Sequence, residues 1–153
     1  MTPRRDWMRL DNAAKIYPAA RRKGWSALFR LCVTLTEPVD PDVLQAALLS
    51  TLKRCVGFAY RLRRGMFWYY MELMPDNVPK VQPDVGNPCV PFDPKDNGGY
   101  SFRVRYYQNR IAVEIFHVLT DGTGGLVFLK TLTAEYLRIK YGAQIPRGND
   151  ILD

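Results

Sequence analysis

The chain has 153 residues, 47% of them hydrophobic and 24% charged, a composition typical of one globular domain over residues 1–153. No run of about eighteen apolar residues occurs, which argues against a transmembrane helix, and the charged N-terminus lacks an apolar signal region, so we expect a cytoplasmic protein. The net charge of +7 favours anionic partners such as nucleic acid, anionic lipid or the phosphates of coenzyme A, although scattered basic clusters are typical of a solvated surface.

The first predicted elements are a short helical turn and a strand. Residues 10–20 predict a turn that is capped by Asp11 or Asn12 and ends near Pro18. Apolar and polar residues then alternate over residues 29–35, which predicts a half-buried strand.

A helix is predicted over residues 41–56. Asp40 is a suitable N-cap, and Pro41 suits the first helical position. Leucines follow at helical spacing, and Gly57 is the expected C-cap.

Two strands over residues 59–63 and 66–73 predict a hairpin with a tight turn at Arg64-Gly65. The aromatic block over residues 67–70 could stack nucleic-acid bases. Adjacent residues of a strand point to opposite faces, however, so we expect these rings to pack in the core and between strands.

The second half of the chain predicts another hairpin and a long helix. Residues 75–99 show no period, and we expect an ordered crossing or a mobile segment. Strands over residues 102–107 and 111–116 flank a turn at residues 108–110, and a helix after the glycine-rich loop runs to about Tyr141. Gly142 is its expected C-cap. The order of elements predicts an α+β fold, with helices packed against a mixed, mostly antiparallel sheet.

The cysteines give no indication of a metal site. Cys32, Cys55 and Cys89 lie far apart, and His117 is the only histidine. Zinc sites and redox dithiols need short spacings. We therefore expect no bound metal, and we expect Cys32 and Cys55 to be reduced, partly buried thiols.

His117 stands at the end of the strand predicted over residues 111–116, before a glycine-rich loop and a helix. Alternation places its side chain on the face of Val113 and Ile115. The positive partial charge of the helix N-terminus disfavours an imidazolium, so the ring can accept a proton. This arrangement suits a general base, although a lone histidine after an apolar strand is more often a packing or capping residue.

Asp121 lies four residues after His117, in the turn before the helix. It can orient His117, pair with an arginine that fixes the loop, or act as an ordinary N-cap. The glycines that follow, Gly122, Gly124 and Gly125, permit backbone angles or close approaches that a side chain would block. The residues alone leave these roles open.

The segment FHVLTDG over residues 116–122 resembles the HxxxDG signature of a superfamily of CoA-dependent acyltransferases. The superfamily includes chloramphenicol acetyltransferase, plant BAHD acyltransferases, alcohol acetyltransferases and the condensation domains of peptide synthetases. Residues 42–48 and 53–58 are similar to its first helix and the following short strand. The runs LDNAAKIYP and RLRRGMFWYY resemble bacterial proteins often named alcohol acetyltransferases.

The resemblance covers about residues 10–142 and implies the N-terminal half of a chloramphenicol acetyltransferase-like fold. It implies that His117 is catalytic and removes a proton from an acceptor alcohol or amine, which attacks an acyl thioester without an acyl-enzyme. The co-substrate is then acyl-CoA or a phosphopantetheine-linked acyl group, and no cofactor is bound. Asp121 and Gly122 are implied to be structural at the active site, Asp121 through an arginine that the sequence does not identify.

The chain departs from the family pattern in two ways. Condensation domains usually carry a second histidine before the catalytic one, where this chain has Phe116, which favours a simpler acyltransferase over peptide-bond synthesis. Family members also have two similar halves with a tunnel between them. We therefore expect this chain to be inactive alone and to need a C-terminal half or self-association.

Two other functions are compatible with the sequence. One is a non-catalytic binding or scaffold half that pairs with a partner chain or an acyl carrier. The other is a nucleic-acid-binding module, which ranks last because the basic residues alternate with apolar ones and form no concentrated stripe. The residues that would bind substrate, the acyl group and the acceptor are not identified by the sequence.

Overall fold

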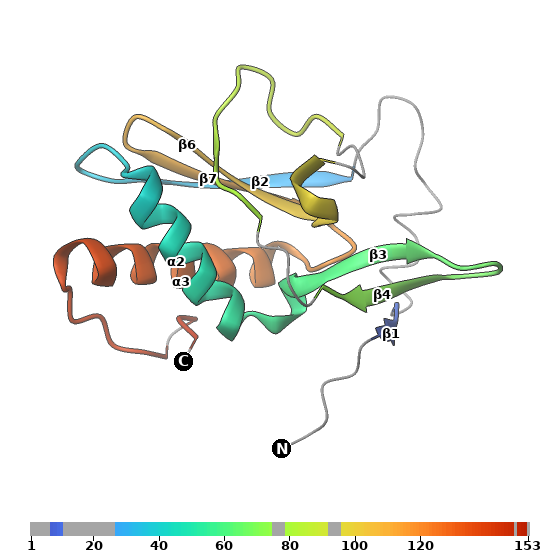
Figure 1. Ribbon diagram of the computed structural model, residues 1–153. Helices are drawn as coiled ribbons and strands as arrows, with labels where there is room; N and C mark the ends of the chain where they lie inside the picture. Colours follow the sequence, from blue (N-terminus) through green and yellow to red (C-terminus); the bar gives the residue numbers. More distant parts are fainter. Residues whose placement is uncertain (1–6, 11–26, 75–78, 92–95, 149, 153) are drawn as a thin grey trace.

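The computed structural model describes residues 7–10, 27–74, 79–91, 96–148 and 150–152. In these ranges two α-helices and two β-sheets form an α+β fold, as predicted (Figure 1). The helical turn expected within residues 10–20 lies, apart from Leu10, outside the described residues. No helix in the described ranges is long and apolar enough to cross a bilayer.

A four-stranded sheet forms the centre of the fold. Its strands follow the order β2 (Leu28–Thr34), β7 (Arg110–Phe116), β6 (Phe102–Tyr107) and β5 (Gln82–Pro83). The first three pair antiparallel, which confirms the predicted strand and the second hairpin, and β5 pairs parallel with β6. The sequence does not predict β5, because two residues in a proline-rich segment show no alternation.

A smaller sheet consists of β1 (Trp7–Arg9), β4 (Tyr69–Leu73) and β3 (Tyr60–Arg64), all antiparallel. The strands that were expected in one mixed sheet are thus divided between two. The hairpin of β3 and β4 extends away from the helices (Figure 1).

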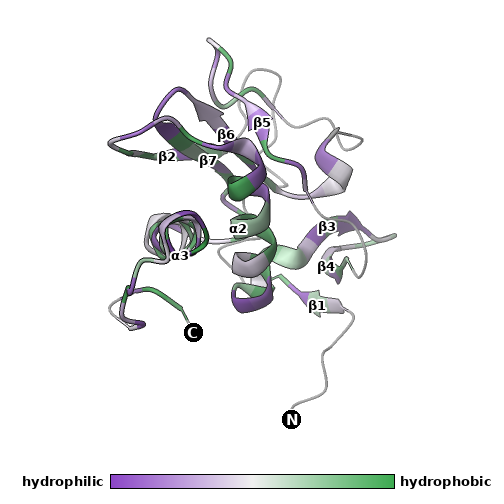
Figure 2. Cartoon of the chain, turned by 60° about the vertical axis from the view of Figure 1, so that its left-hand side comes forward, coloured by the Kyte–Doolittle hydropathy of each residue, from purple (hydrophilic) through white to green (hydrophobic). Residues whose placement is uncertain are grey.

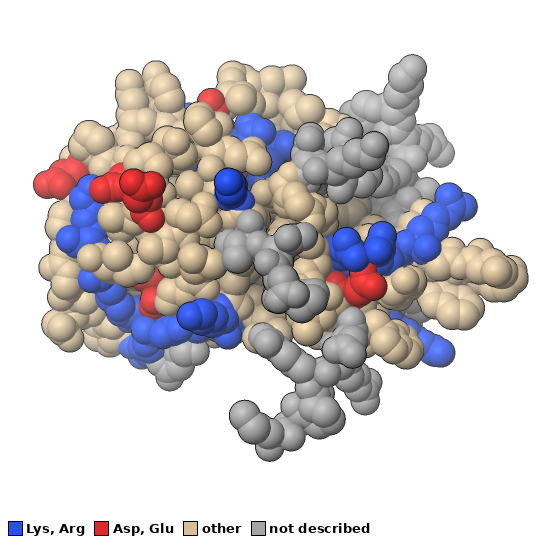
Figure 3. Space-filling model, in the orientation of Figure 1, with Lys and Arg blue, Asp and Glu red and all other residues tan. Residues whose placement is uncertain are grey.

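The tip of this hairpin differs from the prediction. Pairing ends at Arg64 and Tyr69, and the Gly65 N–H donates to the Trp68 carbonyl at 2.7 Å across a loop longer than the expected tight turn. Phe67 is therefore 83% exposed and Trp68 60% exposed, so the expectation that the aromatic block packs in the core and between strands is wrong for these two rings. Tyr69 is partly buried and packs against an apolar cluster, as expected. Basic side chains line the hairpin up to this tip (Figure 3).

Because its ring lies in solvent, Phe67 is expected to contribute little to stability. Phe67→Ser should change the free energy of unfolding by less than about 0.5 kcal/mol, as measured by urea denaturation. Phe102→Ala is the matched control: its ring is fully buried, and its loss should cost about 3–5 kcal/mol. A large loss in the Phe67 variant would contradict the exposed loop.

The two helices begin and end largely as predicted. Helix α2 (Pro41–Arg54) is capped by Asp40, whose carboxylate accepts from the N–H groups of the second and third residues after it. Its C-cap is Cys55, not Gly57, because the chain continues into a short 3-10 helix, η1 (Val56–Ala59). Helix α3 (Gly122–Tyr141) ends at Gly142, whose φ of 64° favours glycine.

Helices α2 and α3 pack on each other and beneath one face of the four-stranded sheet (Figure 2). The fully buried side chains here include Phe102, Ile111, Ile115, Leu44, Leu48, Phe128 and Leu132. Burial of each such apolar side chain stabilises the fold by about 1.5–3 kcal/mol. A second, smaller apolar cluster joins residues of β3 and β4 to Phe116 and Val118.

Candidate functional site

His117 follows the last residue of β7, where the chain leaves the four-stranded sheet. Its backbone N–H donates to the Ala27 carbonyl at 3.0 Å, so contact between β2 and β7 extends one residue past the strand end. The imidazole lies 4.4 Å from the Phe29 ring, centroid to centroid, at an interplanar angle of 39°. The residue is partly exposed. His117 is therefore fixed at its backbone and against one apolar ring, but it is not sealed in the core.

A short loop connects His117 to α3. The Leu119 N–H donates to the Phe116 carbonyl at 2.9 Å, which turns the chain, and Leu119 packs against both apolar clusters. The Gly125 N–H then donates to the Asp121 carbonyl at 3.0 Å as α3 begins. The arrangement of strand end, loop and helix that the sequence predicted around His117 is confirmed.

Asp121 is the N-cap of α3. Its carboxylate accepts a hydrogen bond from the Gly124 N–H at 2.9 Å, and its side chain is exposed. Within the described part of the chain no arginine forms an ion pair with Asp121. Of the three roles open to this residue, the structure shows the cap, and the implied arginine partner stays a prediction.

Removal of this cap should weaken α3. Asp121→Ala is expected to lower the free energy of unfolding by about 1 kcal/mol, because one N–H of the first turn loses its acceptor. Asp121→Asn should retain most of the stability, since asparagine caps helices equally well. Urea denaturation of both variants checks this, and an asparagine variant as unstable as the alanine one would show that the negative charge matters more than the cap.

Two glycines let α3 begin close to the sheet. A Cβ on Gly125 would lie 2.8 Å from Phe29 Cε2 and 3.0 Å from Ile115 Cδ1, and one on Gly124 would lie 1.9 Å from Thr120 Oγ1. The close approaches expected at these two positions are confirmed. At Gly122 a Cβ would meet no atom within 4 Å, so the role implied for Gly122 stays a prediction.

The sheet face opposite α2 and α3 carries a buried ionic network, which was not among the candidate sites predicted from the sequence. Glu114 on β7 is fully buried. It accepts from Arg30 Nη1 at 2.8 Å and from the Cys89 N–H at 2.9 Å, and it pairs with Arg103. Burial alone raises the pKa of Glu114, but these hydrogen bonds outweigh it and hold the pKa below its usual range. The sequence offered one sign of this network: an acidic residue, Glu114, in a strand whose neighbours carry the basic residues Arg30 and Arg103 at the paired positions.

Asp84 joins this network from the segment that crosses the same face. It accepts from Arg30 Nη1 at 3.0 Å and from Arg110 Nη2 at 3.1 Å. The hydrogen bonds from Arg30 chiefly lower the pKa of Asp84. Of the two alternatives for residues 75–99, the described residues show an ordered crossing.

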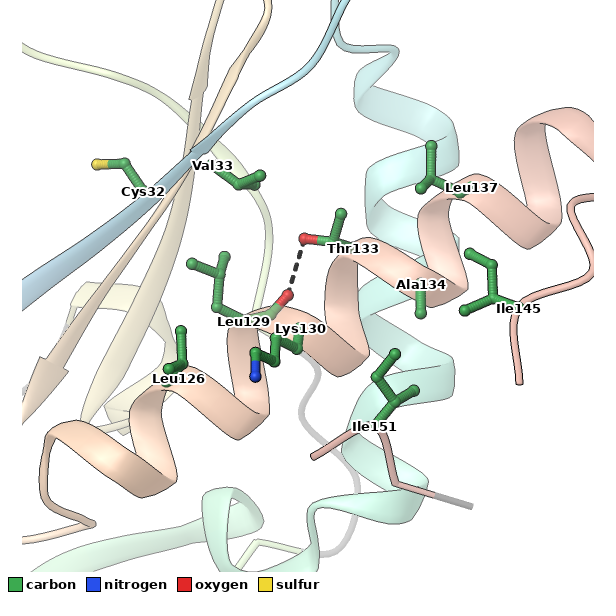
Figure 4. A pocket seen from close by; sticks show the side chains of 10 residues that line it. All are labelled: Cys32, Val33, Leu126, Leu129, Lys130, Thr133, Ala134, Leu137, Ile145 and Ile151. Atoms are coloured by element: carbon green, nitrogen blue, oxygen red, sulfur yellow. Dashed lines mark hydrogen bonds between the residues drawn. The ribbon is translucent and has the colours of Figure 1, made fainter. Parts of the chain in front are cut away.

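An apolar cavity of about 360 Å³ lies between the edge strand β2 and α3 (Figure 4). Val33, Leu129 and Ile151 are among its lining residues, and His117 is not. The Thr133 hydroxyl at its wall donates to the Leu129 carbonyl at 2.8 Å. The cavity is thus separate from the candidate catalytic residue.

The cysteines lie in different environments. Burial raises the pKa of the Cys55 thiol to about 11, whereas Cys32 is exposed, contrary to the partly buried position expected for it. Among the described residues, no group of three or more His, Cys, Asp or Glu side chains could hold a metal ion.

No protein-family model matches the chain, and no curated protein matches its sequence. Solved structures match its fold. The first condensation domain of the calcium-dependent antibiotic synthetase is 17% identical with a TM-score of 0.68, covering 91% of this chain and 39% of that one. The X-domain from teicoplanin biosynthesis, in its complex with OxyB, is 15% identical with a TM-score of 0.71, covering 97% and 36%.

A third similar structure is polyketide synthase associated protein 5 from Mycobacterium tuberculosis, which is 16% identical with a TM-score of 0.65. The match covers 95% of this chain and 37% of that one. The chain therefore spans about two fifths of the structures that it matches, and it has the fold of the corresponding part of a condensation-type domain.

Proposed function

We propose that the chain is half of an acyltransferase that transfers an acyl group from a CoA or carrier-protein thioester to an alcohol or amine. The observation that supports this most directly is the position of His117: partly exposed, at a strand end, on a fold similar to condensation domains. The HxxxDG resemblance gives this histidine the role of general base.

The proposed reaction needs one base and no covalent intermediate on the protein. The imidazole of His117 takes the proton of the acceptor O–H or N–H while the acceptor attacks the thioester carbonyl. The C–S bond breaks as the tetrahedral adduct collapses, and the thiolate leaves and takes up a proton. Phe29 restricts the ring on one side, and the capped start of α3 holds the loop that follows.

The rest of the site is proposed to come from outside this chain. The chain covers only 36–39% of the condensation-type structures described above, so most of each of those structures has no counterpart in this chain. A further segment of a longer polypeptide, or a second chain, would then form the opposite wall of the substrate-binding site. Activity is expected only when that wall is present.

A second candidate is a non-catalytic half that holds a partner protein. The likeness to the X-domain, solved in complex with OxyB, supports this alternative. In this case the fold serves as a docking surface, and His117 packs without reacting.

An assay of thiol release separates the two candidates. Acetyl-CoA and longer acyl-CoAs would be mixed with a panel of alcohols and amines, and with the longest natural polypeptide that contains this sequence. Acceptor-dependent release of free thiol supports the acyltransferase. A well-folded polypeptide that releases no thiol from any acyl-CoA or acyl carrier, but binds a partner protein, supports the binding half.

A further inference from the structure

The polar face of the four-stranded sheet carries more buried guanidinium groups than carboxylates. Among the described residues, the acids of this face are Glu114 and Asp84. Four arginines lie around them: Arg30, Arg103, Arg105 and Arg110. Only Arg110 is substantially exposed, so the excess positive charge lies largely out of water.

The oxygens of both carboxylates are already occupied. One oxygen of Glu114 accepts from Arg30 and from the Cys89 N–H, and the other pairs with Arg103. Both oxygens of Asp84 accept from Arg30, and one also accepts from Arg110. The described residues thus provide no further carboxylate oxygen for another guanidinium on this face.

Among the described residues, Arg105 is the arginine of this group that forms no hydrogen bond with a carboxylate. Its side chain is only 10% exposed, and its Nε and Nη1 atoms are buried without a hydrogen-bond partner. Glu114 Oε2 lies 3.9 Å from Nε, too far for a hydrogen bond. Burial and the charge of Arg103 lower the pKa of Arg105, which reflects the unfavourable surroundings of the charge. A buried guanidinium without partners is costly, and native proteins rarely leave one so.

We propose that Arg105 anchors a binding site for a small oxyanion, a phosphate or carboxylate group, on the polar face of the sheet. Water could satisfy the unpaired N–H groups but could not balance the excess charge. A guanidinium presents its N–H groups as a planar fork that matches two oxygens of a phosphate or carboxylate. Arg30 lies on the same face, and the positive charges around Glu114 outnumber the negative ones. Both observations favour an anion over a neutral ligand.

This site is independent of the proposed acyl transfer. Strand alternation places Arg30 and Arg105 on one face of the sheet and Phe29, against which His117 packs, on the other. Occupation of the anion site can therefore be measured by stability, without any assay of activity.

Thermal unfolding of the 153-residue chain tests the proposal. Inorganic phosphate and acetate would be titrated separately at constant pH and ionic strength, with chloride as the balancing anion. We expect a saturable rise in Tm for at least one of them, about 4–7 °C at a twentyfold excess over its Kd. The anion that saturates identifies the oxyanion class, and no saturable rise with either anion would overturn the proposal.

Three variants connect the response to Arg105. Arg105→Met keeps the apolar stem, and we expect it to lose the saturable rise while its Tm without added anion stays equal to or above that of the unaltered chain. Arg105→Lys keeps the charge without the fork, and its Kd should rise about tenfold. Arg64→Met removes the same charge from the exposed end of β3 and should respond as the unaltered chain does.

A purely structural arginine would give a different result. Arg105→Met would then be less stable by the same amount with and without the anion, and that outcome would exclude the site. Should Arg105→Met fail to fold, the lysine variant and a calorimetric titration of the unaltered chain decide the question. An unchanged Kd in the lysine variant would count against the proposal.

Discussion

If the proposed function is right, replacement of His117 by alanine in the complete protein lowers kcat of acyl transfer by about 10²–10⁴-fold, the usual contribution of a general base. The expectation rests on the partly exposed position of His117 at the end of β7 and on the proposed mechanism, which has no covalent step on the protein. Thiol release from acyl-CoA in the presence of a saturating acceptor measures the effect. The fold should persist, because the residue is only partly buried and the main-chain hydrogen bond to Ala27 is kept.

Lys140→Ala is a suitable control, since Lys140 lies in the last turn of α3, at the other end of the helix that begins beside the loop. Its turnover should be close to that of the unaltered enzyme. Near-normal turnover of the His117 variant, in a preparation whose unaltered form is active, would remove the proposed base. The chain would then retain only the shared fold.

Glu114→Gln is expected to lower the free energy of unfolding by about 3 kcal/mol, because it leaves the surrounding arginines without their central buried charge. The side chain is fully buried and pairs with Arg30 and Arg103 from the two neighbouring strands. A loss of this size should lower Tm by about 6–12 °C. Thermal and urea denaturation measure it directly.

Glu72→Gln is the matched control. Glu72 also pairs with two arginines, Arg61 and Arg63, but its side chain is 33% exposed. Water screens such pairs, so the substitution should cost less than about 1 kcal/mol. Equal losses in the two variants would show that burial of Glu114 does not set the strength of its network.

The stability difference between the unaltered chain and Glu114→Gln should also depend on pH, in a direction that the pKa of Glu114 fixes. The pKa of Glu114 is lower in the folded chain than in the unfolded one, where the pKa of glutamate is about 4.3. Its contribution is therefore fully present above that pH and is lost as the pH falls through the folded pKa. The stability difference between the unaltered chain and Glu114→Gln should be constant near neutrality and should narrow below about pH 4. A difference that grows on acidification would contradict the lowered pKa.

Most of the framework follows from local sequence signals. Asp40 and Pro41 mark the start of α2, Gly142 marks the end of α3, and alternation identifies the β6–β7 hairpin, as the structure confirms. These features depend on contacts within a few residues, which a sequence displays directly. The place of His117 between β7 and α3 was predictable for the same reason.

Other features depend on contacts between distant segments. The exposure of Phe67 depends on where β3 and β4 stop pairing, and composition alone favoured a buried ring. The burial of Glu114 depends on the crossing segment that carries Asp84 and Cys89, which shows no periodic pattern. The arginine implied for Asp121 and the residues of the proposed substrate site stay unidentified, because local patterns describe only contacts within a few residues.

Phe29 lies close to both His117 and the start of α3. Its ring packs on the imidazole of His117, and two of its atoms are among the three nearest neighbours of a Cβ added at Gly125, together with Ile115 Cδ1. A methyl group at Gly125 would push this ring, and the histidine would tilt with it although its own neighbours in sequence are unchanged. A side chain at the start of the helix would thus reach His117 through Phe29, so sequence changes there could alter the proposed activity without touching the reacting atoms.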